Sequence, residues 1–219
     1  MTIPTNIDPK DIQAHWAKYQ DDKYVEGWAS LWDKGDNLPW DRGFPNPALE
    51  DTLVQRAGTI GGPIAQDGQR RKALVPGCGR GVDVLLLSSF GYDAYGLECS
   101  ATAVDACKKE EKENHSRYRV RDEKVGKGKV TFVQGDFFDD TWLKEIGVPR
   151  NGFDVIYDYT VCMLTAAVRL HSVIAIIFSL LVLCVLQGDL QDASLSVFGL
   201  LMCHFRPTLD LSGLSGHSF

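Results

Sequence analysis

Two apolar runs and the helical pattern between them predict an α/β unit near the middle of the chain. Residues 73–75 are a short apolar run typical of a buried strand, and a loop rich in glycine follows. A helical pattern starts near Val82 and stops at residues 90–91, where a glycine can end a helix. A second strand pattern covers residues 93–97 and leads directly to Glu98. Strand, glycine loop, helix and strand with a terminal acid are typical of the nucleotide-binding half of a doubly wound α/β fold.

Hydrophobic periodicity also predicts the elements on both sides of this unit. The expected helices cover residues 11–24, 48–57 and 101–112, with a short one around 142–143, and the expected strands cover residues 130–134 and 153–159. Ser100 is a good N-cap for the helix that follows it. The side chains expected to face the sheet are Leu49, Leu53 and Val54 on one helix, and Ala101, Val104 and Cys107 on another.

The spacing of the glycines in this loop limits which class of ligand it is expected to bind. It reads Gly77-Cys78-Gly79-Arg80-Gly81, so its third glycine comes one residue earlier than in the dinucleotide fingerprint. Glycine lets the backbone adopt positive φ and approach a ligand closely, and Glu98 can accept hydrogen bonds from a ribose diol. The G-x-G-x-G spacing resembles the first motif of class I methyltransferases, which implies S-adenosylmethionine as the cofactor. A glycine turn in another kind of α/β domain is the alternative.

The region before the first strand of this unit is rich in tryptophan. Four of the five tryptophans lie between Trp16 and Trp40. Trp28 and Trp32 are four residues apart, so on a helix they share one face. The cluster has two interpretations: an aromatic lid that only packs on the sheet, or rings that close over the sulfonium cation of the cofactor.

Several separated motifs, taken in order, resemble one family. W-x-x-x-W-D-x-G from Trp28, P-W-D-x-G-x-P around Trp40, L-V-P-G-C-G-x-G and the acid Glu98 are similar to the thiopurine methyltransferase-like family, in particular its fungal and plant thiol or halide methyltransferases. The resemblance covers about residues 11–160. It implies a Rossmann-like class I methyltransferase fold, a three-layer α/β sandwich. It also implies cofactor contacts at Trp28, Trp32, Trp40, Gly77 and Glu98, at Asp136 and Phe137 beside the adenine, and at Tyr159 at the methyl end.

The residues after the third and fourth strands have structural alternatives as well. The Asp136 carboxylate can accept from an exocyclic amine while Phe137 covers the ring, but a loop acid can instead cap the next helix. The sequence shows no acid–base pair for catalysis, so the catalytic residues stay unknown. A thiolate is already a strong nucleophile and needs little help from a base.

Composition excludes several classes of protein. The net charge of −6 and a pI near 5.3 argue against a nucleic-acid surface. The first ten residues do not have the pattern of a signal peptide, and the six cysteines show no zinc spacing. We therefore expect a cytoplasmic monomer with free thiols and no metal, and the family resemblance implies a small-molecule methyl acceptor. Cys78 is expected to fill the tight loop rather than to act as a nucleophile.

The family pattern stops at Thr160, and residues 161–219 have a different composition. Lysine, glutamate, tryptophan and tyrosine are absent from this tail, and residues 173–186 are entirely apolar except for one serine. That run is short of the roughly 20 residues needed to span a membrane, so we expect no membrane span. Our hypothesis is that residues 1–160 form the methyltransferase domain, with a helix and tryptophan-rich lid at 11–45 and the core at 72–160. The tail is then a splicing or gene-model artefact.

This organisation has a structural and a functional consequence. The fold would be incomplete after the fourth strand, whose outer edge would be open unless residues 194–202, which have strand-like stretches, replace the missing neighbour. We therefore expect low stability. The function implied is methyl transfer to a thiol, hydrosulfide or halide. The alternatives are a truncated, inactive relative that at most binds the cofactor, or an enzyme anchored to a membrane through residues 173–186.

Overall fold

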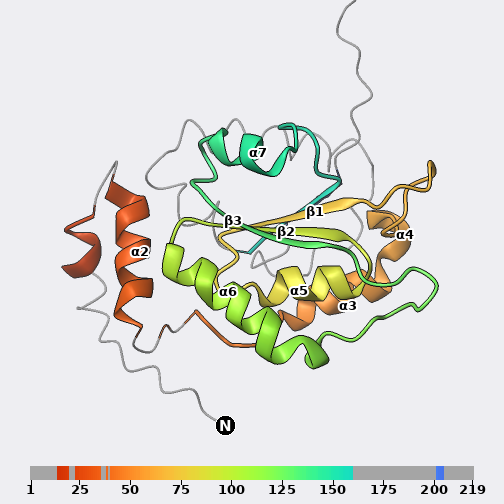
Figure 1. Ribbon diagram of the computed structural model, residues 1–219, viewed down its shortest axis with the longest axis horizontal. Coiled ribbons are helices and arrows are strands. Elements are labelled where there is room, and N and C mark those ends of the chain that lie inside the picture. Colours follow the sequence, from red (N-terminus) through yellow and green to blue (C-terminus); the bar gives the residue numbers. More distant parts are fainter. Residues whose placement is uncertain (1–13, 20–22, 36–37, 39, 160–200, 205–219) are drawn as a thin grey trace, which may run out of the picture.

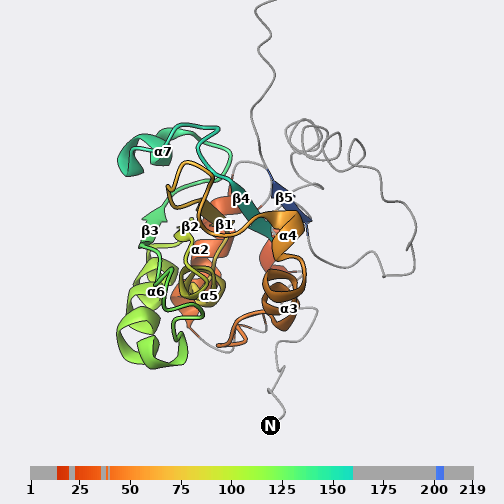
Figure 2. The ribbon, with the colours of Figure 1, turned by 90° about the vertical axis from the view of Figure 1, so that its right-hand side faces the viewer.

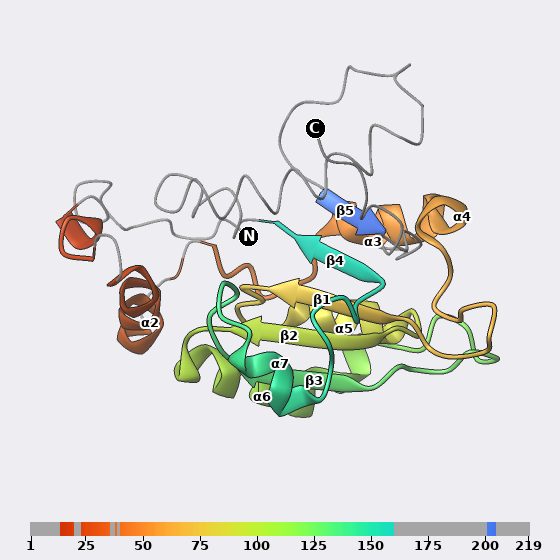
Figure 3. The ribbon, with the colours of Figure 1, turned by 90° about the horizontal axis from the view of Figure 1, so that it is seen from above.

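The computed structural model describes residues 14–19, 23–35, 38, 40–159 and 201–204, and its centre is one sheet. The strands are β1 (Lys72–Pro76), β2 (Asp93–Glu98), β3 (Val130–Gln134), β4 (Val155–Asp158) and β5 (Leu201–His204). Their order is β3-β2-β1-β4-β5, and the first four are parallel (Figure 1, Figure 3). The order reverses between β1 and β4, as in doubly wound sheets, so the predicted Rossmann-like fold is confirmed.

Helices cover both faces of this sheet. They are α2 (Tyr24–Lys34), α3 (Pro47–Gln55), α4 (Ala57–Ile60), α5 (Val82–Ser89), α6 (Ala101–Asn114) and α7 (Thr141–Ile146), with a 3-10 helix η2 (His115–Arg117) after α6. Figures 1 and 2 show α3, α5 and α6 on one face and α7 on the other. Helix α2 lies beyond the carboxyl ends of β1 and β2 (Figure 3). The architecture is a three-layer α/β sandwich, as expected.

The core divides along the alternation of side chains in the strands. Ala73 and Val75 of β1 point to one face, where they join a buried cluster with residues of α3 and α5. Leu74 points to the other face and packs in a cluster with Trp142 and Leu143 of α7. Because both faces of β1 are covered, its apolar residues form a continuous run, which is the pattern expected of a central parallel strand.

Two helices begin where the sequence places strong capping residues. The side chain of Asn46 accepts a hydrogen bond from the Ala48 amide at 3.0 Å, and proline occupies the first position of α3. The Ser100 hydroxyl accepts from the Ala103 amide at 3.2 Å, which confirms the predicted N-cap of α6. These caps fix the directions in which α3 and α6 leave the loops beside the sheet.

Three expectations for the helices are wrong. Residues 14–16 are helical but a turn follows at 17–19, so the helix expected over 11–24 is not continuous. Val54 is 63% exposed, because it lies about 100° around α3 from Leu53, which is buried. Ala101 is exposed, and Ala103 takes the inward position instead, because Ala103 lies four residues before the buried Cys107 and so shares its face of α6, whereas Ala101 does not.

The outer edge of β4 is not open, because the tail supplies a neighbouring strand, which is the alternative that the sequence had left open. Strand β5 pairs with it antiparallel, in a register that sets Val155 opposite His204 and Asp158 opposite Leu201. Strand β5, at residues 201–204, overlaps the end of the strand-like stretch at 194–202 and extends two residues beyond it. The apolar run at 173–186 lies outside the described residues. In the described part of the chain, no helix is both long and apolar enough to cross a membrane.

Candidate active site

A cavity of about 270 Å³ opens at the carboxyl ends of the strands, beside the point where the strand order reverses. Ligands of open α/β sheets bind at this position, because the loops that leave β1 and β4 diverge there. All eight residues expected to contact a cofactor line the cavity: Trp28, Trp32, Trp40, Gly77, Glu98, Asp136, Phe137 and Tyr159. The fold therefore brings together residues that are spread over more than half of the sequence.

The glycine loop forms the part of the wall that follows β1. Gly77, Gly79 and Gly81 have φ values of 56°, 55° and 78°, which side chains with a Cβ rarely adopt. A Cβ on Gly81 would also lie 2.6 Å from the ring of Phe132. Gly77 and Gly79 face the cavity, whereas Gly81 lets the loop pack against β3 and start α5.

Glu98 ends β2 with a buried carboxylate. The side chain is 6% exposed, and it accepts hydrogen bonds from the Gly79 amide at 2.9 Å and the Cys99 amide at 2.8 Å. Burial raises the pKa of Glu98, and these backbone donors oppose the rise. The amides hold the carboxyl group at the cavity wall, where it can still accept hydrogen bonds from a ligand's hydroxyl groups.

Three of the tryptophans, Trp16, Trp28 and Trp40, form a connected aromatic cluster with Tyr24, and Trp32 lies beside the glycine loop. Trp28 meets Trp40 at a centroid distance of 5.2 Å and Trp16 at 4.9 Å, and Trp16 stacks on Tyr24 at 5.3 Å. Trp32 is buried, and its ring lies under Gly79. Both interpretations of the cluster are therefore compatible with the structure: the rings pack as a lid, and three of them also line the cavity.

Asp136 and Phe137 follow β3 on the same side as Glu98. Asp136 accepts a hydrogen bond from the Phe138 amide at 3.0 Å, so it closes its own loop. It does not serve as the cap of α7, since that helix starts at Thr141 without a side-chain cap from its N-cap residue, Asp140, and the Thr141 amide donates to Asp139. Its carboxyl group lines the cavity beside the Phe137 ring.

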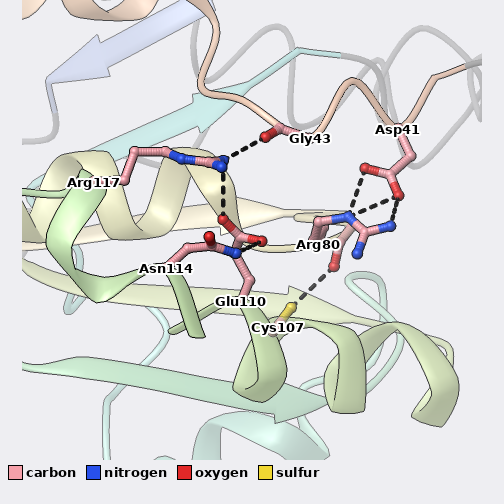
Figure 4. A network of polar contacts seen from close by, with 8 residues as sticks. Asp41, Gly43, Arg80, Cys107, Glu110, Asn114 and Arg117 are labelled. Carbon is pink, nitrogen blue, oxygen red and sulfur yellow. Dashed lines mark hydrogen bonds and ion pairs between the residues drawn. The ribbon is translucent and has the colours of Figure 1, made fainter. Parts of the chain in front are cut away.

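A second part of the wall is the strap, which we define as residues 40–46. Asp41 is almost fully buried and accepts two hydrogen bonds from Nε of Arg80, at 3.0 and 2.9 Å, within an ion pair. Arg117 donates to the Gly43 carbonyl at 2.8 Å and pairs with Glu110 of α6 at 3.4 Å. Figure 4 shows both contacts, which tie the strap to the glycine loop and to the end of α6.

The remaining polar groups of the cavity lie on the β4 side. Arg42 of the strap donates to the Tyr159 hydroxyl at 3.3 Å, and its guanidinium lies 5.8 Å from the Tyr159 ring centroid. Asp83 accepts a hydrogen bond from the Asn46 amide at 2.7 Å. Burial raises the pKa of Asp83 to about 6, although the Asn46 amide and the Arg42 charge oppose the rise.

The hydroxyl of Tyr157 stands out among these groups. Tyr157 is fully buried, and among the described residues its hydroxyl makes no hydrogen bond of ordinary geometry, although the side chain of Asn46 lies close enough to interact with it. Burial, and secondarily the charge of Asp83, raise the pKa of Tyr157, and the Asn46 side chain opposes the rise. A buried hydroxyl without a well-formed hydrogen bond is destabilising, and Tyr157 is one of the residues that line the cavity.

The cysteines around the glycine loop are free thiols in the described part of the chain. Cys78 lies 3.8 Å from Cys107 between their Sγ atoms, and Cys107 donates to the Gly79 carbonyl at 2.9 Å. The Cys107 contact and burial raise the pKa of the Cys78 thiol well above its usual range, which disfavours a thiolate. Cys78 therefore fills the tight loop as predicted.

The sequence reasoning missed Arg42, Asp83 and Tyr157 as cavity residues. Arg42 lies inside the P-W-D-x-G-x-P motif and Asp83 follows the glycine loop, so both could have been predicted as cavity residues from their closeness to these motifs. Tyr157 lies within a strand pattern, where only its place near the carboxyl end could have suggested a role.

Comparisons with known proteins agree with this geometry. The profile of the family described as Thiopurine S-methyltransferase (TPMT) matches residues 24–181, past the point where the sequence motifs stop. "Probable thiol methyltransferase 2" of Arabidopsis thaliana is 34% identical over 135 residues, which are 61% of this chain and 47% of that protein. "Thiocyanate methyltransferase 1" of Brassica oleracea is 30% identical over 157 residues, which are 71% of this chain and 55% of that protein.

One solved structure is reported as "Conversion of a Disulfide Bond into a Thioacetal Group during Echinomycin Biosynthesis". It is 26% identical, covers 64% of this chain and 48% of its own, and has a TM-score of 0.44. The chain spans about half the length of the curated relatives it matches. Because the family profile covers well over half of its residues, the chain belongs to the thiopurine S-methyltransferase family.

Proposed function

We propose that this chain binds S-adenosylmethionine in the cavity and transfers its methyl group to a small soft nucleophile, such as a thiol, hydrosulfide or halide. The observation that carries the proposal is the common cavity of the glycine loop, the buried Glu98 and the tryptophan cluster. The names of the relatives, a thiol and a thiocyanate methyltransferase, support the class of acceptor.

The residues of the cavity suit the chemical groups of this cofactor. Carboxylates follow β2 and β3, where a ribose diol and an exocyclic amine need acceptors, and Phe137 can cover a flat ring between them. Trp28 and Trp40 offer π faces or edges near the glycine loop, and a sulfonium cation is attracted to a π face. The donor and acceptor set therefore matches the cofactor from its adenine to its charged sulfur.

The bound cofactor supplies a methyl group that is already activated by the positive charge on sulfur. What the chain has to supply is position and exclusion of water. Glu98 and Asp136 would fix the adenosine part, and the tryptophan cluster would cover the cavity. Tyr159 would lie at the methyl end, where the acceptor approaches.

Calorimetric binding of S-adenosylhomocysteine to the full chain tests the cofactor site. The chain should bind in the micromolar range, and Glu98→Gln should weaken binding about tenfold or more, because a charged acceptor of two hydroxyl groups is lost. Glu113→Gln on the exposed side of α6 is the matched control and should bind like the unmodified chain. No binding by the unmodified chain would contradict the proposal.

A second candidate is a family member that binds the cofactor without turnover. The match covers only about half of the curated relatives, so their names do not establish turnover by this chain. A screen of thiols, hydrosulfide and halides with labelled cofactor separates the two. Binding with labelled product supports the enzyme, and binding without any product supports the inactive relative.

A further inference from the structure

The cavity has two chemically different sides, and only one is used by the proposed cofactor contacts. Glu98 and Asp136 follow β2 and β3, on one side of the central strand β1. Arg42, Tyr157 and Tyr159 lie on the other side, at β4 and the strap. The inference below concerns this β4 side and rests on the proposed function.

The position of Arg42 is fixed from both directions along the chain. Its preceding neighbour, Asp41, is held by two hydrogen bonds from Arg80, and its following neighbour, Gly43, is held through its carbonyl by Arg117 (Figure 4). Asn46, at the end of the strap, is held by Asp83 through its amide. With these neighbours anchored, the Arg42 side chain is directed along the cavity wall to Tyr159.

The charge of Arg42 is not neutralised by a direct ion pair. Among the described residues, no carboxylate lies within salt-bridge distance of its guanidinium, which donates a hydrogen bond to the neutral phenol of Tyr159 at 3.3 Å. Asp83 is the carboxyl group that acts on it electrostatically, and one of its oxygens is already engaged by the Asn46 amide. Arginine carries five donors, so several remain for a ligand.

The buried hydroxyl of Tyr157 is the second, independent observation. Tyr157 lines the same cavity, and its buried hydroxyl makes no hydrogen bond of ordinary geometry with the described residues, which is costly. A ligand atom that accepts hydrogen bonds would satisfy it. A cation and two phenolic hydroxyls around one space are a set of donors, which suits an anion rather than a neutral or cationic group.

We propose that Arg42, with the hydroxyls of Tyr157 and Tyr159, forms the acceptor site and selects acceptors that are bound as anions. In the transfer, a lone pair of the acceptor forms the new bond to the methyl carbon while the carbon–sulfur bond breaks. The electron pair of that bond stays on the departing sulfur, so the positive and negative charges cancel. No proton has to move within the cavity, which agrees with the lack of an acid–base pair.

The test uses iodide and thiocyanate as probes of the full chain, read by tryptophan fluorescence. Trp28 and Trp40 line the cavity, so an anion bound there should quench them with a saturable component above the linear collisional one. Titrations are run with and without S-adenosylhomocysteine. Arg42→Met, which keeps the length of the side chain without its charge, should weaken the saturable affinity about tenfold. Arg42→Lys should keep part of it.

Controls separate this proposal from the proposed function. Arg119→Met removes an exposed arginine elsewhere, and the anions should quench the tryptophan fluorescence of this variant as they quench that of the unmodified chain. Calorimetry of the Arg42→Met chain should show S-adenosylhomocysteine binding within about twofold of the unmodified chain, which also shows that the variant is folded. If the unmodified chain turns over, the Arg42→Met chain should have a higher KM for anionic acceptors than the unmodified chain and a similar kcat.

Two outcomes overturn the acceptor site. One is linear quenching alone by both anions in the unmodified chain; the other is an equal saturable component in Arg42→Met. If S-adenosylhomocysteine binds in either case, the acceptor inference fails while the proposed function stands. If S-adenosylhomocysteine does not bind but iodide still quenches saturably through Arg42, the proposed function fails and the anion site stands.

Discussion

Two carboxyl groups on the cavity wall are stabilised to different degrees by backbone donors. Glu98 accepts from the amides of Gly79 and Cys99, whereas Asp83 accepts from the single amide of Asn46. Burial raises the pKa of both groups. At residue scale, the difference means that ionised Glu98 is held for a ligand, while ionised Asp83 is a source of instability.

Replacing Asp83 with Asn should remove this instability at neutral pH. The folded pKa of about 6 lies above the ordinary value of 3.8, so the folded chain retains the proton over a range where the unfolded chain has released it. Stability therefore falls as pH rises from about 4 to 6 and stays reduced above that window, by up to about 3 kcal/mol. Asn cannot ionise and can still accept from the Asn46 amide.

Thermal unfolding of both chains at pH 4, 5, 6 and 7 measures the effect. Asp83→Asn should gain stability relative to the unmodified chain as pH rises through this range. A difference between the two chains that is the same at every pH would contradict the raised pKa.

Gly81→Ala should destabilise the glycine loop by about 1–3 kcal/mol. Residue 81 has a φ of +78°, which alanine rarely adopts. Its new Cβ would also lie 2.6 Å from the Phe132 ring and 3.1 Å from the Cys107 sulfur. Gly58→Ala is the matched control, since its Cβ meets nothing within 4 Å and its residue lies in helix α4. Denaturant unfolding should show a lower midpoint for Gly81→Ala only. Equal midpoints would mean that the loop accommodates the methyl group.

At the scale of elements, the strap connects parts of the fold that the sheet does not hold together. It joins the tryptophan-bearing helix α2 to α3, and it is anchored to the glycine loop by Asp41 and to η2 through Gly43. The Asp41 side chain is 8% exposed and that of Arg80 is 35% exposed, and a partly buried, multiply hydrogen-bonded carboxylate–arginine pair is stronger than a fully exposed ion pair. The Asp41–Arg80 pair is therefore the contact most responsible for keeping the strap against the cavity.

Breaking this pair should expose the strap to proteolysis. In Asp41→Ala, trypsin should cut after Arg42 about tenfold faster than in the unmodified chain, because the strap leaves the cavity wall more often. Mass spectrometry of the fragments identifies the cut. Asp105→Ala, which breaks an exposed pair with Lys108 at 3.7 Å, should leave this rate unchanged. Faster cutting in both variants would indicate general destabilisation rather than release of the strap.

The elements that the sequence predicted well are those whose signal is local. The strand at 130–134 has the predicted bounds, and β1 extends one residue beyond the predicted run at each end, because apolar runs and turn residues mark both. The motif residues line the cavity, and Gly77, Glu98 and Tyr159 do so because they lie at or just after strand ends; their contact with a cofactor stays a prediction. The Arg42–Tyr159 contact joins positions 117 apart, and the Asn46–Asp83 contact joins positions 37 apart. No local pattern encodes how the strap folds back to make them.

At the scale of the whole molecule, the stability of the sheet is unevenly distributed. Strand β1 pairs with β2 over five registered residues and with β4 over two, and both its faces are covered. Strand β4 has four residues, and its outer neighbour β5 is equally short. Because the cavity opens between β1 and β4, a ligand bound there contacts both the strongly and the weakly held part of the sheet.

Hydrogen exchange and thermal unfolding of the full chain test this distribution together with the cofactor site. Amides of β4 should exchange faster than those of β1 and β2, and the unfolding midpoint should lie below about 45 °C, the lower end for mesophilic domains. S-adenosylhomocysteine at about 100 times its Kd should add about 2.7 kcal/mol and slow exchange in β4.

At the same concentration of S-adenosylhomocysteine, the Glu98→Gln chain should gain less than half of the stabilisation that the unmodified chain gains from the ligand. The reason is its lower affinity for the ligand. A sharp transition at a high midpoint without ligand would contradict the predicted weakness of β4. A ligand that raises the midpoint equally in both chains would show that it binds without Glu98. The combination expected, a low midpoint that rises with ligand only when Glu98 is present, would mean that the cofactor site helps to hold the two halves of the sheet together.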